Sequence, residues 1–194
     1  MARLLWALGY PEQALQRSTE ALTLAEQLAH PYSLAFTLGC TARLHYFRQE
    51  VQVAKELAEA EIALCTEQGF PFWLAAGTMY RGWALAQQGQ GEEGIAQIHQ
   101  GLAAYRATGT EISWPRHLAL LAEAYGKVGQ AEEGLSVVAE ALATVHKNCE
   151  RFDEAELHRM KGELTLQQSK VQGPKSPAPS TQHPAPKPRP KSVF

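Results

Sequence analysis

A repeat of 40 residues constrains this chain more than any other feature of its sequence. Three segments each carry a glycine, followed at fixed distances by an acid, a small residue and an aliphatic residue: L-G-Y-P-E-Q-A-L from Leu8, Q-G-Q-G-E-E-G-I from Gln88 and V-G-Q-A-E-E-G-L from Val128. The glycines Gly9, Gly89 and Gly129 mark the register. In the second repeat, Gln49 stands at the position of the marker glycine. A constant period of this length is typical of solenoids, in which each unit buries the face of its neighbour.

The register predicts two helices in each period, one on each side of the marker position. In the second helix, small or apolar residues recur at offsets that share one helical face. They are Ala14, Ala21, Leu22 and Ala25 in the first period, Gly94, Gly101, Leu102 and Tyr105 in the third, and Gly134, Ala141, Leu142 and Val145 in the fourth. Ala42, Gly82 and Ala122 coincide in the first helix. Small residues on both helices allow the close backbone approach that an antiparallel hairpin needs.

Glycine and proline predict where the helices end and begin. The marker glycines suit the left-handed conformation that ends a helix, which Gln49 must adopt with more strain. Pro31, Pro71 and Pro115 fit the first turn of a helix, where a missing N–H costs nothing. We therefore expect an all-α solenoid of about nine helices, near residues 1–9, 11–29, 32–48, 51–68, 72–88, 92–108, 114–128, 131–147 and 152–168.

The two ends of the repeat region differ. Only residues 3–8 remain of a first helix that spans about 17 residues in later periods, so we expect a truncated first repeat with an exposed patch at Leu15, Leu22 and Leu24. Residues 151–168 are rich in charge and predict a helix that caps the last repeat. The repeat domain is thus expected over 1–168.

Residues 169–194 are proline-rich and basic, and predict a disordered tail. Of the formal net charge of −2, residues 170–194 supply +5 and the body −7. Two short proline motifs, at 174–177 and 186–190, suit an aromatic groove on a partner, but a plain solvated extension is the simpler interpretation.

The composition argues against several classes of protein. An acidic body disfavours nucleic-acid binding, and no apolar run is long enough for a membrane span. The apolar stretch at the start of the chain is short and ends at Pro11, so no signal peptide is expected. Cys40, Cys65 and Cys149 are odd in number and lack paired spacing, which favours free thiols in a cytoplasmic protein.

No motif for catalysis or for a cofactor is present. The closest approach to a phosphate-binding loop, 173–176, lacks the first glycine, and no two of the seven histidines have metal-ligand spacing. A nucleophile elbow is also missing. We therefore expect a non-catalytic protein with no metal and no cofactor.

The small residues and marker glycines carry a resemblance to the tetratricopeptide (TPR) repeat. Gly82-Trp83-Ala84-Leu85 and Ala122-Glu123-Ala124-Tyr125, with a glycine seven residues further on, resemble the TPR consensus, and the match covers residues 1 to about 168. The resemblance implies a right-handed α-solenoid that binds a protein or peptide. The period of 40 implies longer helices, as in the TPR region of the maltose-operon activator and related signal-transduction ATPases.

A second resemblance lies at 151–164, R-F-D-E-A-E-L-H-R-M-K-G-E-L. This stretch is similar to the end of the C-terminal TPR region of bacterial proteins that pair a class III adenylate or guanylate cyclase, or a DNA-binding domain, with a P-loop ATPase. It implies that catalysis belongs to upstream domains and that this chain is a regulatory fragment. The alternative is a good helix-former with charged i,i+4 pairs.

The TPR resemblance also implies a concave groove lined by the first helix of each repeat. Arginines among aromatics are typical of binding hot spots. Projecting the repeats gives the candidate partner-binding residues Arg3, Trp6, Phe36, Arg43, Tyr46, Phe47, Trp83, Arg116, Glu123 and Glu163. The aromatics among them could instead fill space between the helices.

Two functions remain open at this point. One is a scaffold whose groove holds a partner segment, which Arg43→Glu would disrupt. The other is an intramolecular sensor arm that controls an upstream cyclase or ATPase.

Overall fold

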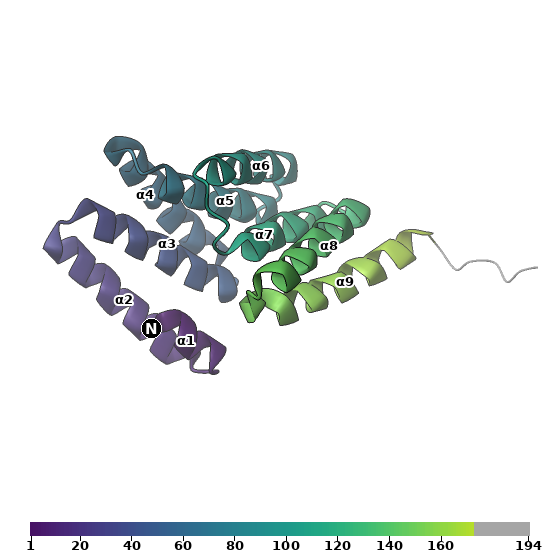
Figure 1. The fold of residues 1–194 in the computed structure, drawn as a ribbon, viewed down its shortest axis with the longest axis horizontal. Coiled ribbons are helices and arrows are strands. Elements are labelled where there is room, and N and C mark those ends of the chain that lie inside the picture. Colours follow the sequence, from purple (N-terminus) through teal and green to yellow (C-terminus); the bar gives the residue numbers. More distant parts are fainter. Residues whose placement is uncertain (173–194) are drawn as a thin grey trace, which may run out of the picture.

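The computed structural model describes residues 1–172, and within this range every regular element is helical (Figure 1). The elements are α1 Ala2–Ala7, α2 Pro11–Leu28, α3 Pro31–Phe47, α4 Val51–Gln68, α5 Pro71–Gln87, α6 Gly91–Ala107, α7 Trp114–Lys127, α8 Ala131–Asn148, a 3-10 turn η1 Arg151–Asp153 and α9 Glu154–Gln172. The expected order of helices is confirmed. Helix α9 ends four residues later than expected, and the rest of the predicted tail lies outside the described residues.

The helices form successive antiparallel hairpins that stack as a solenoid (Figure 1). The first helices of neighbouring hairpins contact one another, α3 with α5, α5 with α7 and α7 with α9. The second helices α2, α4, α6 and α8 pack against the first helices on either side. The first helices therefore form the inner layer of the stack and the second helices the outer layer.

A residue in the left-handed conformation ends each of the first eight helices, at intervals of 20 residues. These residues are Gly9, Ala29, Gln49, Gly69, Gly89, Gly109, Gly129 and Cys149. The prediction for the marker series is confirmed, including the strained Gln49 at φ +57°. The left-handed residues that end the second helices, Ala29, Gly69, Gly109 and Cys149, form another series. This series was not predicted from the sequence, because Ala29 and Cys149 replace glycine at its two ends. Pro31, Pro71 and Pro115 all lie in the first turn of a helix, as predicted.

Small residues allow the closest helix contact, which joins α5 and α6. A Cβ atom added to Gly94 would collide with the carbonyl oxygen of Gly82 and stand 2.7 Å from the backbone nitrogen of Ala86. One added to Gly82 would stand 2.7 Å from the carbonyl oxygen of Gly94. The predicted role of these two positions is thus confirmed.

One buried carboxyl breaks the small-residue pattern. Glu61 occupies the register position of Ala21, Gly101 and Ala141, yet its side chain is fully buried and neither carboxylate oxygen has a hydrogen-bond partner. Its oxygens face Gly39 on α3 and Gly77 on α5, which leave room for them. Burial raises the pKa of Glu61 well above its usual value, an effect that Arg43 partly opposes.

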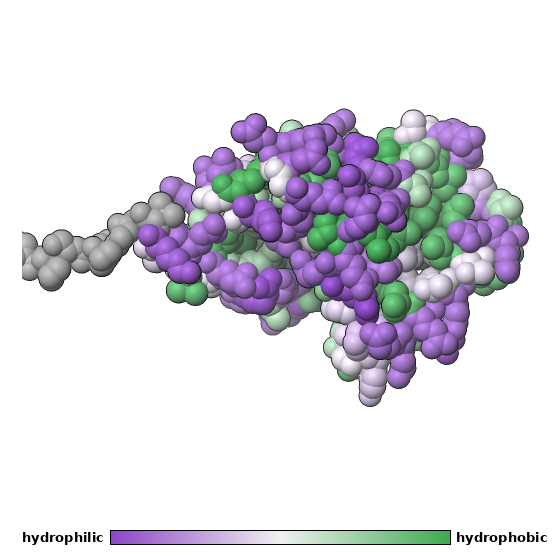
Figure 2. Space-filling view, turned by 180° about the vertical axis from the view of Figure 1, so that it is seen from behind, coloured by the Kyte–Doolittle hydropathy of each residue, from purple (hydrophilic) through white to green (hydrophobic). Residues whose placement is uncertain are grey.

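The two ends of the solenoid differ in polarity, and the expected exposed patch at the first end is confirmed for one of its three leucines. Leu24 is exposed on α2, while Leu15 and Leu22 are half-buried. In Figure 2 hydrophobic side chains gather on one half of the molecule, opposite the grey trace. This half holds α1 to α4. At the other end α9 buries Leu157 and Leu164 against the stack. No helix within residues 1–172 is long and apolar enough to cross a membrane.

Candidate partner-binding groove

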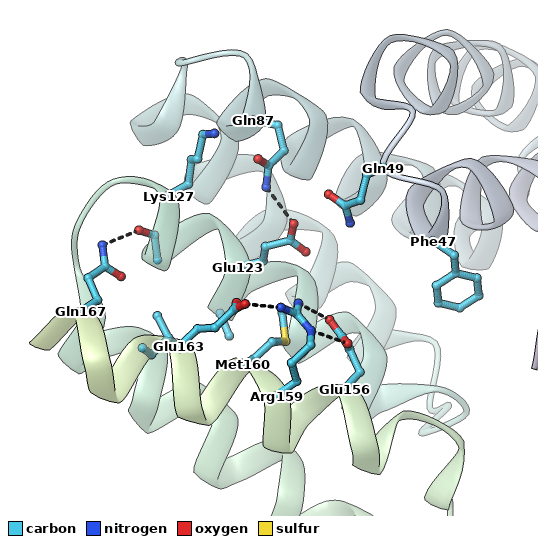
Figure 3. A pocket seen from close by; sticks show the side chains of 13 residues that line it. Phe47, Gln49, Gln87, Glu123, Lys127, Glu156, Arg159, Met160, Glu163 and Gln167 are labelled. Atoms are coloured by element: carbon cyan, nitrogen blue, oxygen red, sulfur yellow. Dashed lines mark hydrogen bonds and ion pairs between the residues drawn. The ribbon is translucent and has the colours of Figure 1, made fainter.

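A groove of about 630 Å³ opens between the C-terminal ends of α3, α5 and α7 and the length of α9 (Figure 3). We call it the inner groove, because the first helices of the hairpins line it. Its polar and charged walls include Gln87, Glu123, Lys127, Glu156, Arg159 and Glu163. It unites side chains from four of the repeats.

The apolar base of the groove comes from two inner helices. Phe47, at the end of α3, forms one end of it and is half-buried. Met160 and Leu164, one turn apart on α9, are nearly fully buried against α7 and α8 and complete the base. An apolar base between charged walls suits a partner segment that combines apolar and charged side chains.

Arg159 is fixed over the groove by two carboxylates of its own helix. Its Nε donates to Glu156 Oε2 at 2.8 Å, its Nη2 pairs with Glu156 Oε1, and its Nη1 with Glu163 Oε1. These hydrogen bonds raise the pKa of the Arg159 guanidinium, and the side chain is half exposed. The spacing of three and four residues places the three groups on one face of α9, where Figure 3 shows them together.

Glu123 lies across the groove from Arg159, on α7. The Nε2 atom of Gln87 donates to Glu123 Oε1 at 2.9 Å and so joins α5 to α7. Burial raises the pKa of Glu123, and the charge of Glu156 adds to this effect. A cationic side chain of a partner would relieve this carboxylate, so the site favours Lys or Arg at this point.

A column of alternating arginine and aromatic side chains lies further along the inner layer. Trp6 stacks on Phe47 with ring centroids 5.8 Å apart. The Arg116 guanidinium carbon lies 4.8 Å from the Phe47 ring centroid and 5.1 Å from that of Phe152, and Arg3 covers Phe152 at 4.5 Å. We call these five residues the Arg–aromatic stack. Because it joins α1, α3, α7 and η1, it closes the inner face between the first and last repeats.

A buried ion pair anchors the stack. Arg116 Nη2 donates to Asp153 Oδ2 at 2.7 Å, and both side chains are almost fully buried. Burial raises the pKa of Asp153, although Arg116 opposes this shift. The neighbouring His117 is also buried, and burial together with Arg116 lowers its pKa to about 3. His117 is therefore neutral at physiological pH and does not add to the positive charge of Arg116.

The structure divides the ten predicted groove residues into four groups. Phe47, Glu123 and Glu163 line the inner groove. Arg3 and Trp6 belong to the Arg–aromatic stack, while Arg43 and Phe36 line a separate hollow between α1, α2 and α3. The remaining three, Tyr46, Trp83 and Arg116, are buried, which corrects their predicted position on the groove surface.

The correction has a physical reason. Tyr46 and Trp83 meet edge to face with centroids 4.9 Å apart, so they fill the space between α3 and α5. The repeat register gives the direction of each side chain but not the distance between neighbouring inner helices. Gln87, Glu156 and Arg159 were missed as groove residues. The spacing of charged residues at 156–163 could have indicated Glu156 and Arg159, but the sequence analysis interpreted these charges only as pairs that stabilise the helix.

Comparison with known proteins confirms the type of fold. The chain is similar to a Podosopora anserina protein described as a kinesin light chain with nearly identical TPR-like repeats, with a TM-score of 0.54 and 20% identity over 88% of this chain and 93% of that chain. A point variant of that protein gives the same TM-score and identity, over 88% and 92%. No family model matches the sequence, and no similar sequence was found among curated proteins.

The chain is therefore an α-solenoid of TPR-like repeats. At 20% identity the similarity concerns the fold alone. Among the described residues, no cluster of His, Cys, Asp or Glu could hold a metal ion.

Proposed function

We propose that this protein is a non-catalytic scaffold whose inner groove binds a segment of a partner protein. The observation that carries the proposal is the groove itself, because it combines a base of Phe47, Met160 and Leu164 with the carboxylates of Glu123, Glu156 and Glu163. The TPR-like neighbours support it as a repeat scaffold of the kind that mediates protein interactions.

The groove favours a partner segment in which a basic residue stands beside an aliphatic or aromatic one. The basic group would pair with Glu123, whose pKa is raised by burial and by the neighbouring charge of Glu156. The apolar group would contact Phe47, the half-buried side chain of the apolar base. Arg159 is already paired twice, so it is a weaker anchor for an acidic partner.

A selection of random peptides on the full chain tests this proposal. Selected peptides should be enriched in Lys or Arg next to an apolar residue. Glu163→Lys should weaken their binding by at least about tenfold, or about 1.4 kcal/mol, because it repels the basic group and removes a partner of Arg159. Glu133→Lys, on the exposed face of α8, is the matched control and should leave binding unchanged. Peptides of no common pattern, or equal binding by both variants, would refute the groove as the site.

We further propose that the chain belongs to a larger bacterial signalling protein and works in the cytoplasm. The similarity of residues 151–164 to the end of cyclase-linked and ATPase-linked TPR regions supports this assignment. An alternative is a sensor arm that controls an upstream adenylate cyclase or P-loop ATPase. The Arg–aromatic stack supports that alternative, since it joins the first and last repeats and a ligand could open it. Sequencing of the genomic reading frame upstream of Met1 tests both, and a stop codon there would contradict them.

A further inference from the structure

The inner groove opens beside the last turns of α9. Gln167 Nε2 donates to the carbonyl oxygen of Gly126 at 2.9 Å, which fixes this part of α9 against α7. Figure 3 shows Gln167 at one end of the groove and Phe47 at the other, with Glu123 between them. Because α9 runs on from Gln167 to Gln172, the chain leaves the helix at the Gln167 end of the groove.

The walls of the groove carry more acid than base. The carboxylates of Glu123, Glu156 and Glu163 stand against two cations, and one of these, Arg159, is already paired with both Glu156 and Glu163. Glu123 accepts a hydrogen bond from Gln87 and has no ion-pair partner within residues 1–172. A positively charged side chain is therefore the complement that the middle of the groove lacks.

The part of the sequence that follows α9 has this complementary charge. Residues 173–194 contain four lysine or arginine residues and no acid. Three of the four fall within K-P-R-P-K-S-V-F at 187–194, where Val193 and Phe194 add apolar side chains. Basic residues close to an aromatic one are the combination that we expect the inner groove to bind.

The distance along the chain allows residues 187–194 to return to the groove. At a rise of about 1.5 Å per residue, Glu163 lies about 14 Å back along α9 from Gln172. Residues 173–187 can span at most about 50 Å, at about 3.3 Å per residue. A tether of this length also gives the segment a local concentration in the millimolar range, so that even a weak internal ligand competes with an external one.

We propose that residues 187–194 bind the inner groove of their own chain and mask it from partners. The basic residues pair with Glu123 and Glu163, and Phe194 contacts Phe47, so the segment runs antiparallel to α9. A partner must displace the segment before it can bind. This regulation rests on the function proposed above, because it uses the same groove.

A fluorescein-labelled peptide with the sequence of residues 185–194 is the probe, and fluorescence anisotropy with the full chain measures its affinity. The tail variant, Lys187→Glu with Arg189→Glu, should bind the peptide about tenfold more tightly than the unsubstituted protein. The reason is that an internal segment with a Kd of about 0.1 mM occupies about nine-tenths of the grooves at an effective concentration of about 1 mM. The matched control, Arg17→Glu with Lys147→Glu, reverses two exposed charges on the outer helices α2 and α8 and should bind as the unsubstituted protein does.

Cross-linking gives a second readout that needs no external ligand. A carbodiimide joins a lysine amine to a carboxylate that lies in contact with it. We expect cross-links from Lys187 or Lys191 to Glu123 or Glu163 within one chain, identified by mass spectrometry of the monomer. Glu133, exposed on α8, is the control carboxylate and should give none.

The outcomes separate this inference from the function proposed above. In the tail variant, the further substitution Glu163→Lys should weaken binding of the peptide by at least about tenfold, because it reverses a charge in the groove. Equal affinity of the tail variant and the unsubstituted protein for the peptide would overturn the inference, as would cross-links found only between two chains. The proposed function is judged on the tail variant with the randomly selected peptides. If Glu163→Lys weakens their binding, the groove remains a partner site even where the chain does not mask it; if binding is unchanged, the groove itself is not the site.

Discussion

Three glycine-to-alanine substitutions test whether close helix contact, rather than helix propensity, governs the stability of this solenoid. All three positions are helical, so each substitution should gain about 1 kcal/mol from propensity alone. At Gly94 the new methyl group meets backbone atoms of Gly82 and Ala86, which cannot move without separating α5 from α6. At Gly134 the nearest atoms are the methyl groups of Leu164, at 3.1 and 3.2 Å. At Gly162 nothing lies within 4 Å.

The three substitutions should therefore differ in sign. Overpacking usually costs about 1–3 kcal/mol, and a backbone obstacle lies at the upper end of this range, so Gly94→Ala should destabilise the fold by about 2 kcal/mol. The corresponding fall in melting temperature is about 4–8 °C. Gly134→Ala should be close to neutral, because Leu164 can shift. Gly162→Ala should stabilise the protein by about 1 kcal/mol and raise the melting temperature by about 2–4 °C.

Thermal and urea unfolding followed by circular dichroism measure all three variants under the same conditions. Because the chemical change is identical, the differences report only the surroundings of each glycine. A melting temperature for Gly94→Ala equal to or above that of the unsubstituted protein would refute the reasoning, since it would mean that the two helices can separate at little cost.

Two further predictions concern the helix ends and the buried acid. Ala29→Gly and Gln49→Gly should each stabilise the fold by about 1 kcal/mol in urea unfolding, because glycine relieves the left-handed strain; Ala60→Gly, in a helix, should lose about as much. The pKa of Glu61 is raised in the folded state above its ordinary value of 4.5. Its contribution to stability is therefore full below pH 4.5 and is lost as the pH rises through the pKa of the folded state. Glu61→Gln should thus unfold like the unsubstituted protein at pH 4 but be about 2 kcal/mol more stable at pH 8, whereas the exposed Glu59→Gln should show no such divergence. Parallel pH profiles for the protein with and without Glu61→Gln would contradict this assignment.

The order of the helices could be predicted because it depends on local signals. Glycine at a helix end, proline in a first turn and small residues at a fixed register each act within a few residues, and the 40-residue period repeats them. The burial of Trp83 and Arg116 could not be predicted in this way, because it depends on how tightly the inner helices curve. Glu61 shows the same limit, since its place in the core requires glycine at both Gly39 and Gly77, on two other helices.

The groove was predicted in part for a related reason. Glu123 and Glu163 share a register position, which sequence reasoning could follow from repeat to repeat. Arg159 and Glu156 stand outside that register, and only the packing of α9 against α7 brings them to the same surface.

The Arg–aromatic stack affects how this protein unfolds. A solenoid held only by nearest neighbours loses its terminal repeats first, while its centre stays folded. Here Arg3 and Phe152 are in contact although almost the whole repeat region separates them in sequence. Loss of either end would therefore break contacts at the other end. The repeats should melt together in one cooperative transition, so that hydrogen exchange protects the first and last hairpins to a similar degree.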